Sequence, residues 1–261
     1  MNLELKNKNA LVCGSTQGIG KASALEIAKL GANVTLVARD ENKLKAVVSE
    51  LDSSKGQKHN YLVADFTRPD ELKKAVEGHT QKNIVHILVN NTGGPAGGPI
   101  AEAKTDEFTQ AFSNHLLCNH ILAQAVIPGM KKEKYGRIIN IISTSVKQPI
   151  KGLGVSNTIR AAVASWSKTL AGELGPFGIT VNNVLPGATN TERLNTLMDA
   201  RAKRAGVSLK EESQEWLKEI PAGRFSDASE IANAVAFLSS PAASYINGIN
   251  LPVDGGRTGS L

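Results

Sequence analysis

A glycine-rich stretch near the N-terminus has residue types and spacing suited to holding a phosphate group. It reads Gly14-Ser15-Thr16-Gln17-Gly18-Ile19-Gly20. The stretch follows an apolar run at residues 10–13 and precedes a helix-period segment at residues 21–30. Glycine permits a tight turn there, so backbone amides and the positive end of the helix dipole can approach a pyrophosphate. In this strand–turn–helix context, the pattern predicts dinucleotide binding rather than a plain glycine-rich turn.

Arg39 stands where a second strand, expected at residues 33–38, comes to its end. In a dinucleotide-binding unit this position faces the adenosine ribose, where an acidic residue would accept a bond from a free 2′-hydroxyl. A guanidinium pairs instead with a 2′-phosphate. The residue therefore favours NADP(H) over NAD(H). The alternative is that Arg39 is a plain surface residue, and Asp40 is in either case expected to cap the following helix.

The elements that would position these residues alternate along the whole chain. Apolar, β-branched runs separated by helical patterns predict a Rossmann-type, doubly wound α/β fold: a parallel sheet between two helical layers in a single domain, residues 1–261. The nearly continuous apolar run at 84–90 is expected near the sheet centre. A charged, helix-prone segment at about 191–223 breaks the rhythm and is interpreted as a lid over the substrate. The expected strands are residues 10–13, 33–38, 61–64, 84–90, 137–142, 180–185 and 249–253.

Composition excludes several classes of protein. Of the 261 residues, 41% are hydrophobic and 21% charged, as in ordinary folded domains. The longest apolar run, residues 234–238, is far too short for a membrane helix. The net charge of +6 comes from scattered basic residues without interleaved aromatics, which argues against nucleic-acid binding. Two cysteines and no visible secretory signal fit a cytoplasmic protein. No metal site is expected.

Several separated motifs resemble those of the short-chain dehydrogenase/reductase family. Besides the glycine loop, they are Asp65, the run Asn90-Asn91-Thr92-Gly93 after the expected fourth strand, Pro186-Gly187 after the sixth, and Val253-Asp254-Gly255-Gly256 near the C-terminus. The C-terminal section is similar to that of bacterial 3-oxoacyl-acyl-carrier-protein reductases. Two positions depart from the family pattern: Cys13 replaces a threonine and Thr92 an alanine.

The resemblance implies a seven-stranded parallel sheet and a homo-oligomer, usually a tetramer, otherwise a dimer. It places ligands beyond the carboxyl ends of the strands. Cofactor contacts are then expected from Asp65 and Phe66 near the adenine and from Asn91, Thr92 and Gly93 on the adenosine side. Further contacts are expected near the nicotinamide and diphosphate, from Pro186, Gly187 and Thr191.

The catalytic pattern departs from the family. Such enzymes reduce carbonyls with Asn, Ser, Tyr and Lys, and Asn114 and Ser143 match the first two. Thirteen residues after Ser143, where the tyrosine normally stands, the sequence has Ser156, and four residues later Arg160 replaces the lysine. The following amphipathic segment supports this alignment.

These replacements change the acid–base chemistry. Hydride addition to a carbonyl leaves an alkoxide that needs a proton, and serine is a far weaker acid than tyrosine. Arginine keeps its proton, since its pKa lies above about 12. Carbonyl reduction is thus expected to be slowed by about a hundred- to ten-thousandfold. Arg160, one helical turn from Ser156, can still bind the nicotinamide ribose and stabilise an oxyanion, while Ser143 and Ser156 bind the carbonyl oxygen and water supplies the proton.

Two functions follow. One is an NADP(H)-dependent oxidoreductase acting on a small carbonyl or alcohol substrate, with 3-oxoacyl compounds as one candidate and an atypical catalytic site. The other is an NADP(H)-binding protein without turnover that serves as a cofactor-responsive or structural subunit. His115, about 100° around a helix from Asn114, is assigned a packing or surface role. Trp216 in the lid segment is the better candidate of the two tryptophans for substrate contact.

Overall fold

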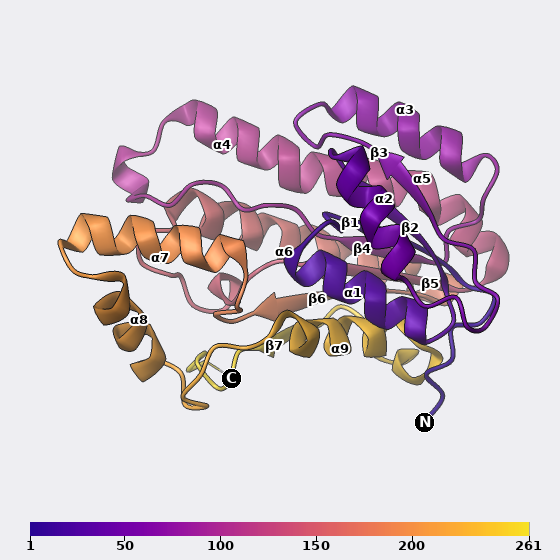
Figure 1. The fold of residues 1–261 in the computed structure, drawn as a ribbon. Helices are drawn as coiled ribbons and strands as arrows, with labels where there is room; N and C mark the ends of the chain where they lie inside the picture. The colour runs from indigo at the N-terminus through magenta and orange to yellow at the C-terminus, as the bar shows by residue number, and fades with distance from the viewer. Residues whose placement is uncertain (261) are drawn as a thin grey trace.

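The computed structural model describes residues 1–260, which form one parallel sheet between two layers of helices (Figure 1). The strand order is β3-β2-β1-β4-β5-β6-β7, and every neighbouring pair is parallel. This confirms the predicted doubly wound fold, with β4 at its centre. The strands are β1 (Asn9–Cys13), β2 (Asn33–Ala38), β3 (Asn60–Val63), β4 (Ile87–Asn90), β5 (Gly136–Ile141), β6 (Ile179–Pro186) and β7 (Asn250–Val253).

The helices cover both faces of the sheet. Helices α1 and α9 pack together on one face, whereas α3 and α5 pack together on the other. The helices are α1 (Gly18–Lys29), α2 (Glu41–Glu50), α3 (Pro69–Thr80), α4 (Thr105–Phe112), α5 (Cys118–Glu133), α6 (Gly154–Leu174), α7 (Glu192–Ala205), α8 (Leu209–Lys218) and α9 (Ala228–Ser239).

Alternation along the strands divides the apolar core into two layers. In β1, Ala10 and Val12 join the cluster that includes α1 and α9, while Leu11 and Cys13 join the cluster beneath α3 and α5. Successive side chains of a strand point to opposite faces, so a strand covered on both sides is apolar at every position. This is why the run at the sheet centre, residues 84–90, is almost entirely apolar.

Strand β4 is shorter than predicted. It begins at Ile87 rather than at residue 84. The imidazole Nδ1 of His86 accepts the backbone N–H of Asn9 at 3.0 Å, and the Asn9 side chain donates to the carbonyl of Ile84 at 2.7 Å. Side chains therefore replace part of the regular backbone ladder over residues 84–86.

A row of asparagines, of which Asn90, Asn140 and Asn183 are buried, crosses four neighbouring strands. Asn90, Asn140, Asn183 and Asn250 are in register on β4, β5, β6 and β7. Each side-chain amide is hydrogen-bonded to the next, at 2.8, 2.9 and 2.8 Å. Asn140 also donates to Ser167 of α6 at 3.3 Å. We call this row the amide ladder, and it ties β4, β5, β6 and β7 to one another through their side chains.

The segment predicted as a lid forms α7 and α8, which lie to one side of the strand ends (Figure 1). The two helices have a small apolar core of their own, distinct from the layers against the sheet. Its buried members are Ala188, Leu194, Met198, Trp216 and Ile220, with Phe225 packed against them.

Candidate functional site

The glycine-rich loop is shaped so that backbone, not side chains, lines it. Gly14 and Gly18 have φ of +58° and +54°, which side chains rarely tolerate. A Cβ on Gly20 would lie 2.1 Å from the Gly14 carbonyl oxygen. Asn91 Nδ2, which donates to that oxygen at 3.2 Å, holds the loop against the end of β4. No side chain caps the N-terminus of α1 at Gln17. The exposed helix N-terminus and tight loop fit a phosphate.

Not every residue of the loop presents its side chain outward. Ser15 is fully buried, and its hydroxyl accepts the Val37 N–H at 3.1 Å. Any cofactor contact by Ser15 therefore falls to its backbone. Thr16 and Ile19 are half-buried and Gln17 is exposed on the outer side of the loop.

Two charged residues that were predicted to lie on the adenosine side, Arg39 and Asp65, are close enough for the charge of one to act on the other. Arg39 is exposed after β2, and Asp65 follows β3. Burial works to raise the pKa of Asp65, but the hydrogen bonds from Thr67 and the charge of Arg39 outweigh it, so its pKa lies below the usual value. Asp40 accepts the Lys43 N–H at 3.0 Å, which confirms its predicted role as the cap of α2.

The loop after β6 reaches back to the glycine loop. Pro186 ends β6. A Cβ on Gly187 would lie 2.6 Å from Asp254 Cα, so only glycine lets the C-terminal section pack here. Thr191 caps α7 by accepting the Leu194 N–H at 3.3 Å. Its methyl group would lie 3.3 Å from a Cβ on Gly18, so the structure brings Thr191 beside the loop.

Ser156 and Arg160 lie in the first turns of α6 and are each only 7% exposed. The Arg160 guanidinium donates to the carbonyl of Ile141 at 3.1 Å and to that of Thr92 at 3.4 Å. It therefore bridges the ends of β5 and β4. Burial, and then the charge of Arg193, lower its pKa to about 10, so it remains a cation at neutral pH.

The other two predicted catalytic residues lie at element ends nearby. Ser143 follows β5 and accepts the Ser145 N–H at 3.0 Å. Asn114 is half-buried in a π-helix, residues Ser113–Leu117. Within residues 1–260, no hydrogen bond joins the side chains of Asn114, Ser143 and Ser156 to one another.

His115 belongs to the site, which the sequence did not predict. It is buried, as in the packing role, but its Nδ1 is hydrogen-bonded to Thr92 Oγ1. Asn114 and His115 lie in a π-helix, where the angle between successive side chains differs from the 100° of a regular α-helix. Its bonding partner is the hydroxyl at position 92, one of the two departures from the family pattern.

The field and burial at this site keep His115 neutral. Burial, then the charges of Arg160 and Arg193, lower its pKa to about 2 from an ordinary value near 6.5. The unfolded chain thus binds a proton below pH 6.5 that the folded chain excludes, and stability falls as the pH drops. We expect wild type to lose about 2 kcal/mol of unfolding free energy from this group between pH 7 and 5.

His115→Gln, which keeps a polar side chain that does not titrate, should lose about 2 kcal/mol less over the same interval. Urea unfolding of both proteins at pH 7 and 5 measures the difference. Equal pH dependence of the two proteins would contradict the assignment.

Arg193 is a second site residue that sequence reasoning missed. It lies in the first turn of α7 and is half-buried. Its Nη2 donates to the carbonyl of Pro95 at 2.5 Å. The side chain therefore spans from the lid segment to the loop after β4. The only sequence signal was a basic residue close behind Thr191.

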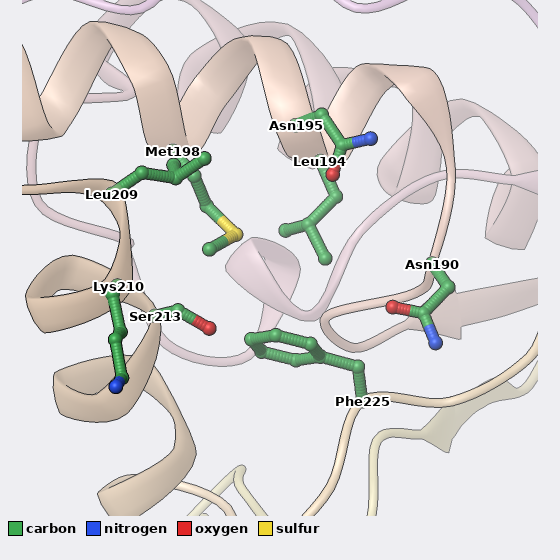
Figure 2. Close-up of a pocket in the computed structure, with 8 residues that line it drawn as sticks. All are labelled: Asn190, Leu194, Asn195, Met198, Leu209, Lys210, Ser213 and Phe225. Atoms are coloured by element: carbon green, nitrogen blue, oxygen red, sulfur yellow. The ribbon is translucent and has the colours of Figure 1, made fainter.

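A cavity of about 470 Å³ lies between α7, α8 and Phe225 (Figure 2). Leu194, Met198 and Phe225 point into the same space. None of the predicted catalytic residues lines it. The other lining residues are Asn190, Asn195, Leu209, Lys210 and Ser213.

Trp216 does not have the exposure expected of a substrate contact. It is 7% exposed, and its Nε1 donates to Glu212 at 2.8 Å. The Arg201 guanidinium lies 4.8 Å from its ring centroid. Helix α8 directs Trp216 into the small apolar core of the lid segment. Trp216 is therefore a packing residue.

Comparison with known proteins places this arrangement in a family. Residues 14–258 match the family described as Enoyl-(Acyl carrier protein) reductase. The chain is 36% identical to 3-oxoacyl-[acyl-carrier-protein] reductase FabG of Vibrio cholerae serotype O1 over 98% of both chains. It belongs to the short-chain dehydrogenase/reductase family. The FabG of Escherichia coli strain K12 is likewise 36% identical over 98% of both chains.

Solved structures of short-chain reductases superpose closely on this fold. L-sorbose reductase from Gluconobacter frateurii, complexed with NADPH and L-sorbose, has a TM-score of 0.92 at 31% identity over 100% of both chains. YwfH, described as an NADPH-dependent reductase involved in bacilysin biosynthesis, has a TM-score of 0.91 at 27% identity. That match covers 97% of this chain and 99% of YwfH.

Residues 1–260 have neither a membrane-spanning helix nor a metal-binding cluster. No helix there is long and apolar enough to cross a membrane. No group of three or more His, Cys, Asp or Glu side chains is arranged to hold a metal ion.

Proposed function

We propose that this protein is an NADP(H)-dependent oxidoreductase that acts on a small carbonyl or alcohol substrate, with Ser156 and Arg160 in place of the family's tyrosine and lysine. The proposal rests on the position of Arg160, a buried cation that donates to the carbonyls of Ile141 and Thr92, while Asn91, one residue before Thr92, is bonded to the glycine-rich loop. The kinship with reductases over the whole chain supports it.

The cofactor would be held along the carboxyl ends of the strands. The diphosphate would lie against the amides of residues 14–20 and the N-terminus of α1. The adenine would lie near Asp65 and Phe66, the adenosine side near residues 91–93, and the nicotinamide near Pro186, Gly187 and Thr191. When bound, NADPH supplies the hydride. The L-sorbose reductase was solved with NADPH. A protein of Beutenbergia cavernae described as an NAD(P)-dependent gluconate 5-dehydrogenase, 29% identical, was solved with bound NADP at low occupancy.

Arg39 decides between the two cofactors in this proposal, because it can form charge-assisted hydrogen bonds to a 2′-phosphate. Arg39→Ala is expected to raise the Kd for NADPH about 10- to 100-fold, which corresponds to about 1.5–3 kcal/mol. The Kd for NADH should change less than about threefold. Isothermal titration calorimetry measures both, with Arg68→Ala, another exposed arginine, as control. An equal loss for both cofactors would contradict the assignment.

The chain's own groups would stabilise the substrate oxygen. The hydroxyls of Ser143 and Ser156 donate hydrogen bonds to it, and the Arg160 cation lowers the free energy of the negative charge that develops there. Water delivers the proton, since serine is too weak an acid. His115, neutral and bonded to Thr92, adds no charge to this site.

No tyrosine within residues 1–260 is placed to act as the general acid in place of the family's tyrosine. Tyr61 donates to Glu41 at 2.9 Å, and Tyr135 donates to the Ser239 carbonyl at 2.8 Å. Tyr245 is fully exposed in the C-terminal section. This observation favours a second candidate function, a cofactor-binding protein without turnover.

Turnover separates the two candidates. The purified protein with NADPH should oxidise it in the presence of at least some members of a panel of ketones and 3-oxoacyl thioesters, followed by absorbance at 340 nm. Calorimetry with NADPH alone tests binding. Binding without oxidation against the whole panel would favour the second candidate, and an absence of binding would contradict both.

A further inference from the structure

The guanidinium of Arg193 faces the loop between β4 and α4, and most of its N–H donors have no acceptor within residues 1–260. A guanidinium carries five N–H donors, and the only hydrogen bond of this side chain within residues 1–260 is to Pro95. A Cβ on Gly94 would lie 3.1 Å from Nη2, so the side chain lies close above residues 94–95. These residues directly follow the 91–93 segment of the proposed cofactor site. Arg193 therefore borders the site with most of its donors unused.

Arg160 and Arg193 form a pair of cations without a counterion. Each lowers the pKa of His115, and Arg193 lowers that of Arg160, so the three side chains share one field. Within the described chain, no carboxylate lies within 4.0 Å of either guanidinium. Arg201, on the same helix as Arg193, is by contrast paired with Glu212 at 2.8 Å. Burying positive charge without a partner costs free energy. A ligand with a negative charge would offset that cost at this site.

The positive character continues outward from Arg193 along α7. A narrow cleft separates that helix from the loops at residues 97–98 and 151–153, which are themselves joined by a bridge between Gly98 and Leu153. Its lining includes the cations Lys151, Arg201 and Arg204, of which Arg201 is paired with Glu212. The lining residues are Gly97, Lys151, Gly152, Leu153, Leu197, Ala200, Arg201, Arg204 and Trp216. Lys151 and Arg204 give this cleft a net positive charge, which attracts ligands of the opposite sign.

We propose that the substrate is an oxo acid, or the corresponding hydroxy acid, whose carboxylate is bound by Arg193. The inference rests on the proposed function and names its substrate class. A carboxylate accepts two parallel N–H donors from one guanidinium, a geometry that fixes orientation as well as position. It would hold the reacting carbonyl toward Ser143 and Ser156. The carbonyl carbon accepts a hydride from NADPH, which is oxidised to NADP⁺, the C=O π bond breaks, and the oxygen takes a proton from water.

The first test compares acids with neutral counterparts of the same skeleton. NADPH oxidation is measured with a panel of 2-, 3- and 4-oxo acids and their methyl esters. We expect kcat/KM for the preferred acid to exceed that for its ester about 10- to 100-fold, in line with one charge-assisted pair. Arg193→Gln should remove this preference through KM, and Arg193→Lys should restore part of it. Lys203→Gln, which removes an exposed cation of the same helix that does not line this cleft, should change kcat/KM less than about threefold.

The second test needs no turnover. Malonate and inorganic phosphate are titrated separately into the complex with NADP⁺ by calorimetry. We expect malonate to bind wild type and to bind Arg193→Gln at least 10-fold more weakly, a loss of about 1.4 kcal/mol. Tighter binding of phosphate than of malonate would overturn the carboxylate assignment. Binding of neither would overturn the inference altogether.

The outcomes separate this inference from the proposed function. Esters reduced as well as acids would leave an oxidoreductase whose substrate is not an acid. Malonate binding that depends on Arg193, without NADPH oxidation by any compound, would retain the anion site and reject turnover. A higher Kd for NADPH in Arg193→Gln, with unchanged malonate binding, would assign Arg193 to the cofactor and overturn the inference.

Discussion

Gly20→Ala is expected to weaken NADPH binding by at least about a hundredfold, the equivalent of losing two charge-assisted hydrogen bonds. The new Cβ would lie 2.1 Å from the Gly14 carbonyl oxygen and 2.6 Å from Asn91 Nδ2. Neither is the free end of a flexible side chain, because Asn91 is itself bonded to Gly14. The loop must open, and its amides then no longer converge on one phosphate. Calorimetric titration with NADPH measures the loss.

Gly78→Ala is the matched control, since a Cβ there meets nothing within 4 Å. It places the same methyl group on α3, away from the loop, and should bind NADPH as wild type does. Circular dichroism of both variants establishes that the sheet has formed. Affinity of Gly20→Ala within about threefold of wild type would show that the loop does not hold the diphosphate.

The Ser156→Tyr/Arg160→Lys double variant is expected to raise the rate of carbonyl reduction about a hundred- to ten-thousandfold, the usual contribution of a positioned general acid. The two positions are one turn apart on α6 and both are buried. A lysine ammonium there would lower the pKa of the new phenol, and the phenol would protonate the developing alkoxide. Single-turnover oxidation of NADPH with an accepted ketone measures the chemical step.

Ser156→Phe/Arg160→Lys supplies the control, because it adds an aromatic ring of nearly the same size without the acidic hydroxyl. It should show no gain. A double tyrosine–lysine variant slower than wild type would show that the natural serine and arginine support the chemistry better than the usual pair. Activity confined to that variant would identify the natural chain as a cofactor-binding protein without turnover.

The fold could be predicted because its signals are local and repeated. Each strand of the sheet has its own apolar run, and the strand at the centre is buried at every position. Strand ends could not be fixed to the residue, since they depend on contacts from elsewhere in the chain. The start of β4 is an example. The His86 ring accepts a hydrogen bond from the Asn9 amide, and the strand begins at Ile87 instead of at residue 84.

In the candidate site, too, features set by local spacing could be predicted, whereas residues placed by distant contacts could not. The glycine loop and the shared helix face of Ser156 and Arg160 follow from spacing within one segment. His115 and Arg193 could not be found that way. The position of His115 depends on a π-helix, which the pattern of apolar residues does not predict. That of Arg193 depends on how α7 folds back over Pro95, sequence-distant by nearly a hundred residues.

The amide ladder also has a direction. Asn90 donates to Asn140, which donates to Asn183, which donates to Asn250. Hydrogen bonds aligned head to tail polarise one another, so the row acts as a short dipole. Its negative end is the Asn90 Oδ1, a buried oxygen with no bonding partner within residues 1–260. That end lies two residues before Thr92, whose carbonyl accepts a bond from Arg160. Reversing any single amide would place two donors or two acceptors opposite each other, so the four amides can only reorient together. Their common polarity stabilises the Arg160 cation at the end of β4.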